Sequence, residues 1–398
     1  MKGVLWLASW YPNKTDHFTG DFIQRQARAT ARFVPLNLIF ATKDLSPDQA
    51  EANNYWIPEA TDSDIHEYIR YYPVSRSPFA FFFKLHSVWQ YFKQHLIILK
   101  ELEKKREMPD IVHVQVAMKA GLIALYLRKR YKIPFVITEH WWGYFDESTD
   151  ALKNKGMVFR YLTKKIFQHA SFFLPVTHNL GNRVNQTISR VPTMVIPNVV
   201  DTSKFNTTDC KDPERFRFIH VSSLLNLKNP EGIIRSFEKL IESGFDADLV
   251  IVGPAPAGLQ QMIAKKSKLR DRLFFTGEVN YETVATQLKK ASAFVLFSWI
   301  ESLPCVILEA LCCGLPVISS RAGGIAEAVG AENGILIDAG NEGQLLDAMK
   351  KIITGYSRYD KESISLQARQ LYSYDTVGKQ YVQVYQKVLN KESVSVQR

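Results

Sequence analysis

The sequence contains no run of 18 or more apolar residues, although 46% of its 398 residues are hydrophobic. A helix that spans a bilayer needs about 20 consecutive apolar residues, so no membrane-spanning segment is expected. The first residues, MKGVLWLASWYPNK, lack a signal-peptide cleavage pattern and are more typical of a buried first strand. The sequence therefore predicts a globular protein of about two domains, since 398 residues exceed one ordinary hydrophobic core.

Cysteine is also scarce, with four residues in the whole chain: Cys210, Cys305, Cys312 and Cys313. None of them forms a Cys-x-x-Cys pair, and no histidine cluster accompanies them. This pattern argues against a zinc site and against a disulfide framework. We expect all four cysteines to be reduced, as in a cytoplasmic protein.

Positive charge is concentrated in one part of the chain. Between Arg70 and Ala170 there are 18 Lys and Arg against 8 Asp and Glu, an excess of 10 that equals the excess of the whole chain. Such a stretch suits a phosphate, a nucleic acid or an anionic membrane, or it forms a solvated surface without a partner. No nucleic-acid-binding motif accompanies the charge, so nucleic acid is not an expected partner. The aromatic and basic segment PFAFFFKLHSVWQYFKQH is either a membrane-interface helix or a buried core helix.

Short apolar runs alternate with helical patterns along the first half of the chain. This alternation predicts a parallel sheet with crossover helices. The expected strands are Val4–Ala8, Leu36–Ala41, Ile111–Gln115, Phe135–Thr138 and Phe172–Val176. The expected helices are Phe22–Phe33, Phe79 to about Lys105, Met118–Arg130 and Lys155–His169.

The second half repeats the alternation, with Gly and Pro at the junctions. Two doubly wound, Rossmann-like domains are therefore expected, with a join near Asn198–Arg215. The expected strands are Phe216–Ser222, Asp248–Val252, Leu273–Thr276, Ala293–Phe297, Pro316–Ser319 and Ile335–Ile337. The expected helices are Pro230–Ser243, Gly258–Leu269, Tyr281–Lys290, Val306–Cys313, Ile325–Val329 and Glu342–Thr354. Ligands bind beyond the carboxyl ends of parallel strands, so two facing sheets would form an interdomain cleft.

Glu301 and Glu309 are the strongest chemical signal, within SWIESLPCVILEALCCGLPVISSRAGG. Seven residues separate them, and Pro304 is expected to start the helix that carries Glu309. The N–H groups of Cys305 and Val306, at the positive end of that helix, would favour a phosphate. Two carboxylates beside that site can each accept paired hydrogen bonds from sugar diols. Two surface glutamates without a ligand are the alternative.

This segment resembles the E-x7-E element of glycosyltransferase family 4, whose members have the two-domain GT-B fold. The resemblance covers the carboxy-terminal half of the chain. It implies that Glu301 holds hydroxyls of a donor hexose and that Glu309 holds the nucleotide ribose. It also implies an acceptor-binding domain over residues 1–200 and a nucleotide-sugar-binding domain over residues 201–375. Residues 376–398 are expected to form a helix that returns to the first domain and ends in a frayed tail.

Lys228, in HVSSLLNLKNPEG, follows a predicted strand and can neutralise a departing diphosphate. The family usually has an Arg about five residues earlier, where this chain has Ser223. One cation of the usual pair is therefore missing, although the serine hydroxyl and backbone can still contact phosphate. A solvated lysine at a helix start is the alternative.

Gly20 and His140 are the candidates in the first half. The resemblance implies that the loop with Gly20 lets the donor pyrophosphate approach the backbone, while a plain turn glycine is the alternative. His140, in TEHWWGYF, follows a predicted strand and can hydrogen-bond the hexose or orient the acceptor, unless it is a structural histidine. The neighbouring Trp141 and Trp142 either stack on a sugar or pack in the core.

Several weaker matches complete the resemblance. Asn198 and Asp201 fit an interdomain segment, and Gly277 to Val279 resemble a loop that carries the nucleotide base. Thr177 and His178 are expected at a strand end near the acceptor. Gly323 and Gly324 would let the chain pass close to the donor.

The resemblance thus implies a retaining, metal-independent hexosyltransferase that uses a nucleotide-diphosphate sugar and no cofactor. Its acceptor would be a glycan or a lipid-linked molecule used in cell-surface polysaccharide synthesis. The protein is expected in the cytoplasm, bound peripherally to the inner face of the cell membrane. The expected catalytic residues are His140, Glu301 and Lys228. The expected donor ligands are Gly20, Ser223, Lys228, Gly277, Val279, Glu301, Pro304, Cys305, Val306 and Glu309. No Asp-x-Asp pair stands in a metal-binding context, as expected for a metal-independent enzyme. The alternative functions are a nucleotide-sugar epimerase of GT-B fold and a non-catalytic sugar-nucleotide-binding protein.

Overall fold

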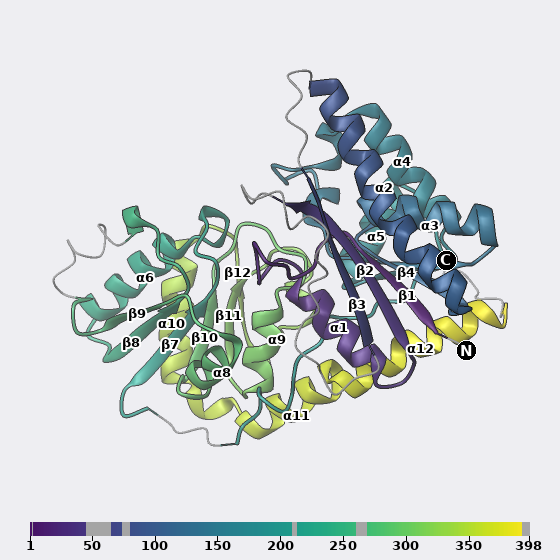
Figure 1. Cartoon of the computed structure of the whole chain (residues 1–398). Coiled ribbons are helices and arrows are strands. Elements are labelled where there is room, and N and C mark those ends of the chain that lie inside the picture. The colour runs from purple at the N-terminus through teal and green to yellow at the C-terminus, as the bar shows by residue number, and fades with distance from the viewer. Residues whose placement is uncertain (2, 45–64, 74–79, 209–212, 260–268, 392–398) are drawn as a thin grey trace. The chain divides into compact units, whose positions relative to one another are not determined.

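The computed structural model describes residues 1, 3–44, 65–73, 80–208, 213–259 and 269–391 (Figure 1). They form two compact units, each with its own six-stranded sheet. The first unit comprises Met1–Val176, Gly181–Pro197 and Tyr374–Arg398. The second unit comprises Thr177–Leu180 and Asn198–Ser373.

The first unit contains a sheet with the strand order β3-β2-β1-β4-β5-β6, in which every neighbouring pair is parallel. Its strands are β1 (Val4–Ala8), β2 (Leu36–Asp44), β3 (Ile65–Pro73), β4 (Ile111–Gln115), β5 (Phe135–Glu139) and β6 (Phe172–Pro175). Its helices are α1 (Asp21–Ala31), α2 (Ala80–Lys105), α3 (Ala117–Tyr131), α4 (Met157–His169), most of α5 (His178–Thr187) and α12 (Tyr374–Leu389). The central strands β1, β4 and β5 are buried along their whole length, as expected for a sheet covered on both faces.

The last helix of the chain, α12, belongs to the first unit and packs along α1 (Figure 1). Arg32, which follows α1, donates a hydrogen bond of 2.9 Å to Asp375 and lies over the ring of Tyr374. Deeper in the unit, Tyr381 and Tyr385 of α12 are fully buried. The C-terminal helix therefore contributes to the core beneath β1 and β4.

The second unit contains a parallel sheet with the order β12-β11-β10-β7-β8-β9. Its strands are β7 (Phe216–Val221), β8 (Ala247–Val252), β9 (Leu273–Gly277), β10 (Ala293–Leu296), β11 (Val317–Ser320) and β12 (Gly334–Ile337). Its helices are α6 (Pro230–Glu242), α8 (Tyr281–Lys289), α9 (Cys305–Cys312), α10 (Glu342–Thr354) and α11 (Lys361–Tyr372). Two parallel sheets with flanking helices confirm the predicted α/β, doubly wound fold class.

Local sequence explains where the helices of the second unit begin. Asn229 accepts a hydrogen bond from the N–H of Gly232 and precedes Pro230, a residue suited to the first helical position. Asn280 and Asn341 cap α8 and α10 in the same way. The apolar faces of α6 and α10 then pack with the strands in one buried cluster, which includes Phe237, Ile251 and Met349.

The structure corrects some predicted elements. Strand β3 was not expected, because its first four residues are half-buried or exposed and the sequence IHEYIRYYP lacks an apolar run. Residues Ile325–Glu327 form one 3-10 turn, so the expected helix Ile325–Val329 is wrong. Thr177 and His178 do not end a strand; His178 begins α5, and the Thr177 hydroxyl accepts the N–H of Leu180. Most of the expected helix Gly258–Leu269 lies outside the described residues.

Within the described ranges, no helix is both long enough and apolar enough to cross a membrane. Of the interface segment proposed from the sequence, the side chains before His86 lie outside the described part. The remainder has two faces, since Tyr91 and His95 are buried while Val88 and Trp89 are exposed. Part of this helix is therefore core, and part faces solvent.

Candidate functional site

Lys228 and Glu301 meet beyond the carboxyl ends of β7 and β10 in the second unit. Lys228 ends a 3-10 turn over Asn226–Lys228, and Glu301 lies in the loop between β10 and α9. The Lys228 Nζ atom is 2.6 Å from Oε1 of Glu301, which is 8% exposed. The sequence indicated both residues but did not predict that they form an ion pair with each other.

The two loops that carry this ion pair are joined through their backbones. The N–H of Trp299 donates to the carbonyl of Leu227 at 2.9 Å. On the other side, Gly323 has φ +55°, and a Cβ atom there would lie 1.8 Å from the carbonyl oxygen of Glu301. The next residue, Gly324, donates its N–H to Ser302 at 2.9 Å. Only glycine at position 323 lets its loop approach the loop of Glu301 this closely, and this contact fixes the backbone of Glu301.

A buried histidine, His220 near the end of β7, supports the loop that contains Ser223. Its Nδ1 atom lies 2.8 Å from the carbonyl of Val295, and its Nε2 atom lies 2.8 Å from the Ser222 hydroxyl. Burial lowers the pKa of His220 to about 4, so the ring is neutral at pH 7. Because a carbonyl only accepts, Nδ1 carries the proton and Nε2 accepts from Ser222. Ser223 itself is exposed at the surface of this turn.

Helix α9 begins at Cys305, so Pro304 occupies the residue before the helix and not its first turn. The N–H groups of Cys305 and Val306 lie in that first turn, where the helix dipole favours an anion. The helix is held in place by its apolar residues, since Ile307, Leu308 and Leu311 are almost fully buried. Cys305, Cys312 and Cys313 are free cysteines, and Cys210 lies outside the described residues.

Glu309 lies on α9 and is 4% exposed. Its Oε1 atom accepts a hydrogen bond of 3.0 Å from the hydroxyl of Tyr281, the first residue of α8. Gly277, which has φ +73°, is the last residue of β9, and the half-buried Val279 lies in the short connection from β9 to α8. Sequence reasoning missed Tyr281, although its position two residues after Val279 placed it at the same strand end.

In the first unit, the carboxylate of Glu139 organises the turn that carries His140. Its two oxygens accept hydrogen bonds from the N–H groups of Ala117, His140 and Trp141 at 3.0, 3.2 and 3.1 Å, and from the Tyr144 hydroxyl at 3.0 Å. Burial raises the pKa of Glu139 to about 7, while these hydrogen bonds act in the opposite direction. No role was predicted from the sequence for Glu139, the residue directly before His140.

His140 is 8% exposed, and its ring lies 4.6 Å from that of Phe22. Its Nε2 atom is 3.4 Å from the amide oxygen of Gln115, at the end of β4. Of the two tryptophans that follow, Trp141 is buried with its ring 5.1 Å from Tyr144, whereas Trp142 is half-buried. Trp141 therefore belongs to the core.

Gly20 precedes the first residue of α1 and has φ +72°. A Cβ atom at this position would lie 2.7 Å from the carbonyl carbon of Trp10. Both the dihedral angle and the close backbone contact require glycine, so the local fold alone explains this residue. A role toward the donor stays a prediction.

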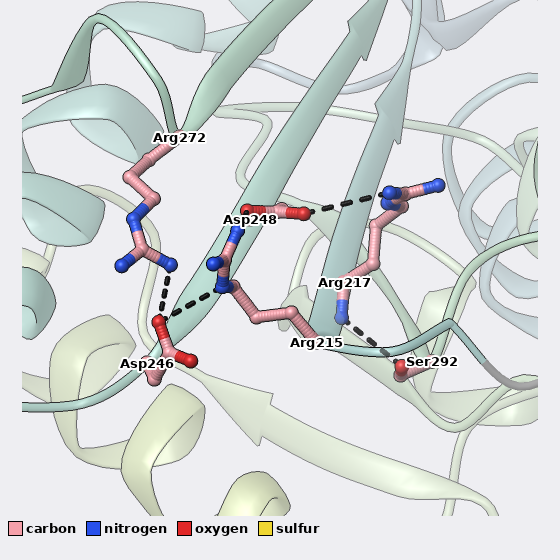
Figure 2. Close-up of polar contacts among 6 residues, drawn as sticks. All are labelled: Arg215, Arg217, Asp246, Asp248, Arg272 and Ser292. Carbon is pink, nitrogen blue, oxygen red and sulfur yellow. Dashed lines mark hydrogen bonds and ion pairs between the residues drawn. The ribbon is translucent and has the colours of Figure 1, made fainter.

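The second unit contains an Asp-x-Asp sequence, Asp246 to Asp248, at the amino end of β8. Figure 2 shows that three arginines surround these carboxylates. Arg215 contacts both aspartates at 2.9 and 3.1 Å, Arg217 contacts Asp248 at 3.4 Å, and Arg272 pairs with Asp246. This cluster lies at the strand starts, opposite to Lys228 and Glu301, and acts as structural support. Across the described residues, no group of three His, Cys, Asp or Glu side chains is arranged to hold a metal ion.

Two family profiles match the chain in succession. The profile for "Glycosyltransferase Family 4" matches residues 46–204, and the profile for "Glycosyl transferases group 1" matches residues 206–369. Among curated proteins, TuaC of Bacillus subtilis, named for teichuronic acid biosynthesis, is 27% identical over 277 residues, which are 67% of this chain and 65% of TuaC. The N-acetyl-alpha-D-glucosaminyl L-malate synthase of Bacillus anthracis is 26% identical over 64% of this chain and 69% of its own length.

Solved structures share the fold at low sequence identity. The sucrose-phosphate synthase of Thermosynechococcus elongatus has a TM-score of 0.73 and 16% identity, with 98% of this chain and 100% of that chain covered. Anabaena HepE in complex with UDP has a TM-score of 0.70 and 15% identity, with 97% and 100% covered. These matches extend over both units, and at such identities they describe the fold alone.

Proposed function

Because this chain belongs to glycosyltransferase family 4 and has the GT-B fold, we propose that it is a retaining hexosyltransferase. The donor is a nucleoside-diphosphate sugar, and the acceptor is a glycan or a lipid-linked sugar used in cell-surface polysaccharide synthesis. The Lys228–Glu301 ion pair beside α9 is the observation that carries this proposal. It joins a cation to a carboxylate in the loop that leads into the N-terminus of α9, and a diphosphate with an attached sugar would be bound by such groups.

Each group in the second unit has a distinct part in this proposal. Glu309, held by Tyr281, binds the ribose diol, and Glu301 binds hydroxyls of the hexose. Lys228 and the N–H groups of Cys305 and Val306 bind the diphosphate. Since Anabaena HepE was solved with UDP and with UDP-glucose, a uridine nucleotide is a reasonable first donor to test.

The remaining donor ligands of the proposal act mainly through their backbones. Gly277 and Val279 face the nucleotide base, while the turn at Ser223 approaches the phosphates. Pro304 sets the direction of the chain into α9, since its φ of −69° and ψ of 123° are extended. Gly20 of the first unit is assigned to the pyrophosphate through the family resemblance alone.

The proposed chemistry is a front-face displacement at the anomeric carbon. The bond between that carbon and the diphosphate oxygen breaks while the acceptor oxygen forms its new bond on the same face. The leaving diphosphate takes the acceptor proton, and Lys228 stabilises the negative charge that develops on it. His140 contacts the sugar or orients the acceptor. No cofactor or metal ion is assigned a part in this scheme.

A thermal-shift screen of UDP-, GDP- and ADP-sugars tests the donor assignment, since a ligand that binds only the folded state raises its stability. We expect one nucleotide series to raise the melting temperature of the wild-type protein and to lose most of that effect in Glu309→Ala. Chromatography of the nucleotide fraction after incubation separates the alternatives. A new nucleotide sugar formed without acceptor indicates an epimerase, and binding without any turnover indicates a non-catalytic protein.

We also propose that the first unit binds an anionic membrane surface through α4. The first two turns of α4 expose Met157, Val158 and Tyr161 at 78%, 72% and 60% of their surface. Arg160 and Lys164 are exposed on the same helix. An exposed apolar group bordered by cations fits the interface of a bilayer with negative headgroups.

Sedimentation with vesicles tests this surface. The wild-type protein should bind phosphatidylglycerol vesicles at low salt, release at about 1 M salt, where the screening length is roughly 3 Å, and bind phosphatidylcholine vesicles weakly. Replacing Met157 and Tyr161 with Ser should weaken binding at every salt concentration. Replacing two exposed apolar residues of the second unit, Leu366 and Leu371, with Ser is the matched control and should leave binding unchanged. Unchanged binding of the α4 variant would contradict the assignment.

A further inference from the structure

A chain of buried side chains links the last helix of the first unit to the centre of its sheet. The indole N–H of Trp6 in β1 donates to the hydroxyl of Tyr385 in α12 at 3.1 Å. That hydroxyl lies 2.6 Å from Nδ1 of His113 in β4. On the other side of the ring, Nε2 of His113 lies 2.7 Å from the Thr138 hydroxyl in β5. All four residues are fully buried, so bulk water does not compete for these contacts.

The same histidine contacts the group that touches His140. Gln115 stands two residues after His113, so both side chains project from the same face of β4. The amide nitrogen of Gln115 is 3.4 Å from Nε2 of His113, and its amide oxygen is 3.4 Å from Nε2 of His140. Gln115 is fully buried. The amide therefore bridges the two imidazole rings.

The bridge makes the protonation of one ring depend on the other. Burial lowers the pKa of His113 well below its usual value, so its ring is neutral, with one donor and one acceptor nitrogen. An amide presents a donor at one end and an acceptor at the other. With the amide nitrogen facing His113, Nε2 of His113 accepts, and its proton is on Nδ1 toward Tyr385. The amide oxygen then faces His140, which matches a proton on Nε2 of that ring.

We propose that His113 is a positioning residue for His140. Held by Tyr385 and Thr138, it fixes the orientation of Gln115 and thereby the nitrogen of His140 that carries the proton. His113 acts through Gln115 and does not touch substrate. This proposal deepens the function proposed for His140 and rests on it.

Nitrogen-15 NMR of histidine-labelled protein tests the proposal without any substrate. The ring nitrogens of the two neutral tautomers have different shifts, and the His140→Asn variant identifies the signals of His140. We expect one tautomer, protonated at Nε2, in the wild-type protein and a mixture in His113→Phe, which keeps a ring but loses the polar contacts to Tyr385, Thr138 and Gln115. His113→Gln, which retains polar atoms near the Nε2 position, should restore part of the wild-type pattern. His140 signals that are identical in all three proteins would overturn the proposal.

A second test is kinetic and measures the rate at which nucleoside diphosphate is released from UDP-, GDP- and ADP-sugars. His113→Phe should lower kcat by about 10- to 100-fold and leave KM for the donor within about threefold, since the proposed donor ligands other than Gly20 lie in the second unit. The double variant with His140→Ala should be no slower than His140→Ala alone, because His113 acts only through His140. Additive losses would overturn the proposal.

A control variant separates positioning from a general loss of stability. His95 in α2 is also a buried histidine of the first unit, and its Nδ1 atom lies 2.9 Å from the carbonyl of Tyr91. His95→Phe should lower the melting temperature while kcat stays near that of the wild-type protein. If His140→Ala keeps wild-type turnover, the role proposed for His140 fails together with this inference. If His140→Ala is slow but His113→Phe is not, only the inference fails.

Discussion

Replacing Lys228 with Ala should lower turnover far more than it lowers stability. In the folded protein, the substitution leaves the Glu301 carboxylate, 8% exposed, without the cation 2.6 Å away. A hydrogen bond to a charged group contributes about 1.5–3 kcal/mol. The Lys228 side chain is 25% exposed, so water replaces part of the lost interaction, and we expect a stability loss of about 1–2 kcal/mol.

The effect on the reaction should be larger, because the additional negative charge that Lys228 is proposed to stabilise develops only as the diphosphate departs. Removing one such preorganised donor typically lowers kcat by about 10²- to 10³-fold. The assay is the steady-state rate of nucleoside-diphosphate release at saturating donor and acceptor, with denaturant unfolding measured on the same samples. Ethylammonium chloride should restore part of the rate in Lys228→Ala, whereas sodium chloride at equal ionic strength should not.

A double-mutant cycle measures the interaction energy between Lys228 and Glu301. Lys228→Ala, Glu301→Gln and the double variant should give a coupling of about 1–2 kcal/mol in the free energy of unfolding, since the double variant no longer contains an unpaired buried carboxylate. A correctly folded Lys228→Ala protein with wild-type turnover would refute the catalytic role. A coupling near zero would refute the ion pair in solution.

Three further predictions concern other groups. Glu309→Ala should weaken nucleoside-diphosphate affinity, measured by calorimetry, about 10- to 100-fold. Tyr281→Phe, which removes only the hydroxyl bonded to Glu309, should weaken it less. Equal affinities in these two variants and the wild-type protein would contradict the ribose assignment. Turnover should survive EDTA, because no metal has a part in the proposed chemistry; complete loss that Mg²⁺ or Mn²⁺ reverses would contradict it. The pKa of Glu139 is raised from 4.5 to about 7 in the folded state. Between these pH values the folded protein therefore binds more protons than the unfolded chain. The contribution of Glu139 to the free energy of unfolding should fall by about 3 kcal/mol as pH rises from about 4.5 to 7. Urea unfolding across this range should show that fall in the wild-type protein and a flatter profile in Glu139→Gln; parallel profiles would contradict it.

Periodicity was sufficient to predict the central strands, because strands such as β1 and β5 are buried on both faces and begin with apolar runs, VLWLA and FVI. It was not sufficient for β3 at the sheet edge, where only part of the strand is buried. Periodicity also predicted a helix over Ile325–Val329, where the chain forms only a 3-10 turn after the glycine pair. Edge strands and short turns depend on tertiary contacts that local patterns do not contain.

The candidate residues of the second unit could also be predicted from the sequence, because they follow predicted strands. Lys228 and Glu301 follow predicted strands, and parallel strands bring their carboxyl ends to one edge. Their direct contact was not predictable, because it depends on loop conformations set by Gly323 and by the Trp299–Leu227 hydrogen bond. Buried polar groups such as His113 and His220 were missed, since a single histidine in an apolar strand gives no spacing signal.

The proposed reaction transfers a sugar from a nucleotide donor to an acceptor. The most direct measurement incubates the protein with radiolabelled UDP-, GDP- and ADP-sugars and a panel of glycolipid and polyprenyl-diphosphate-linked acceptors, and compares sugar incorporated with nucleoside diphosphate released. We expect one donor series for which the two amounts are equal and depend on acceptor. Conversion of the donor into another nucleotide sugar without incorporation, or the absence of incorporation from every donor that binds, would contradict it.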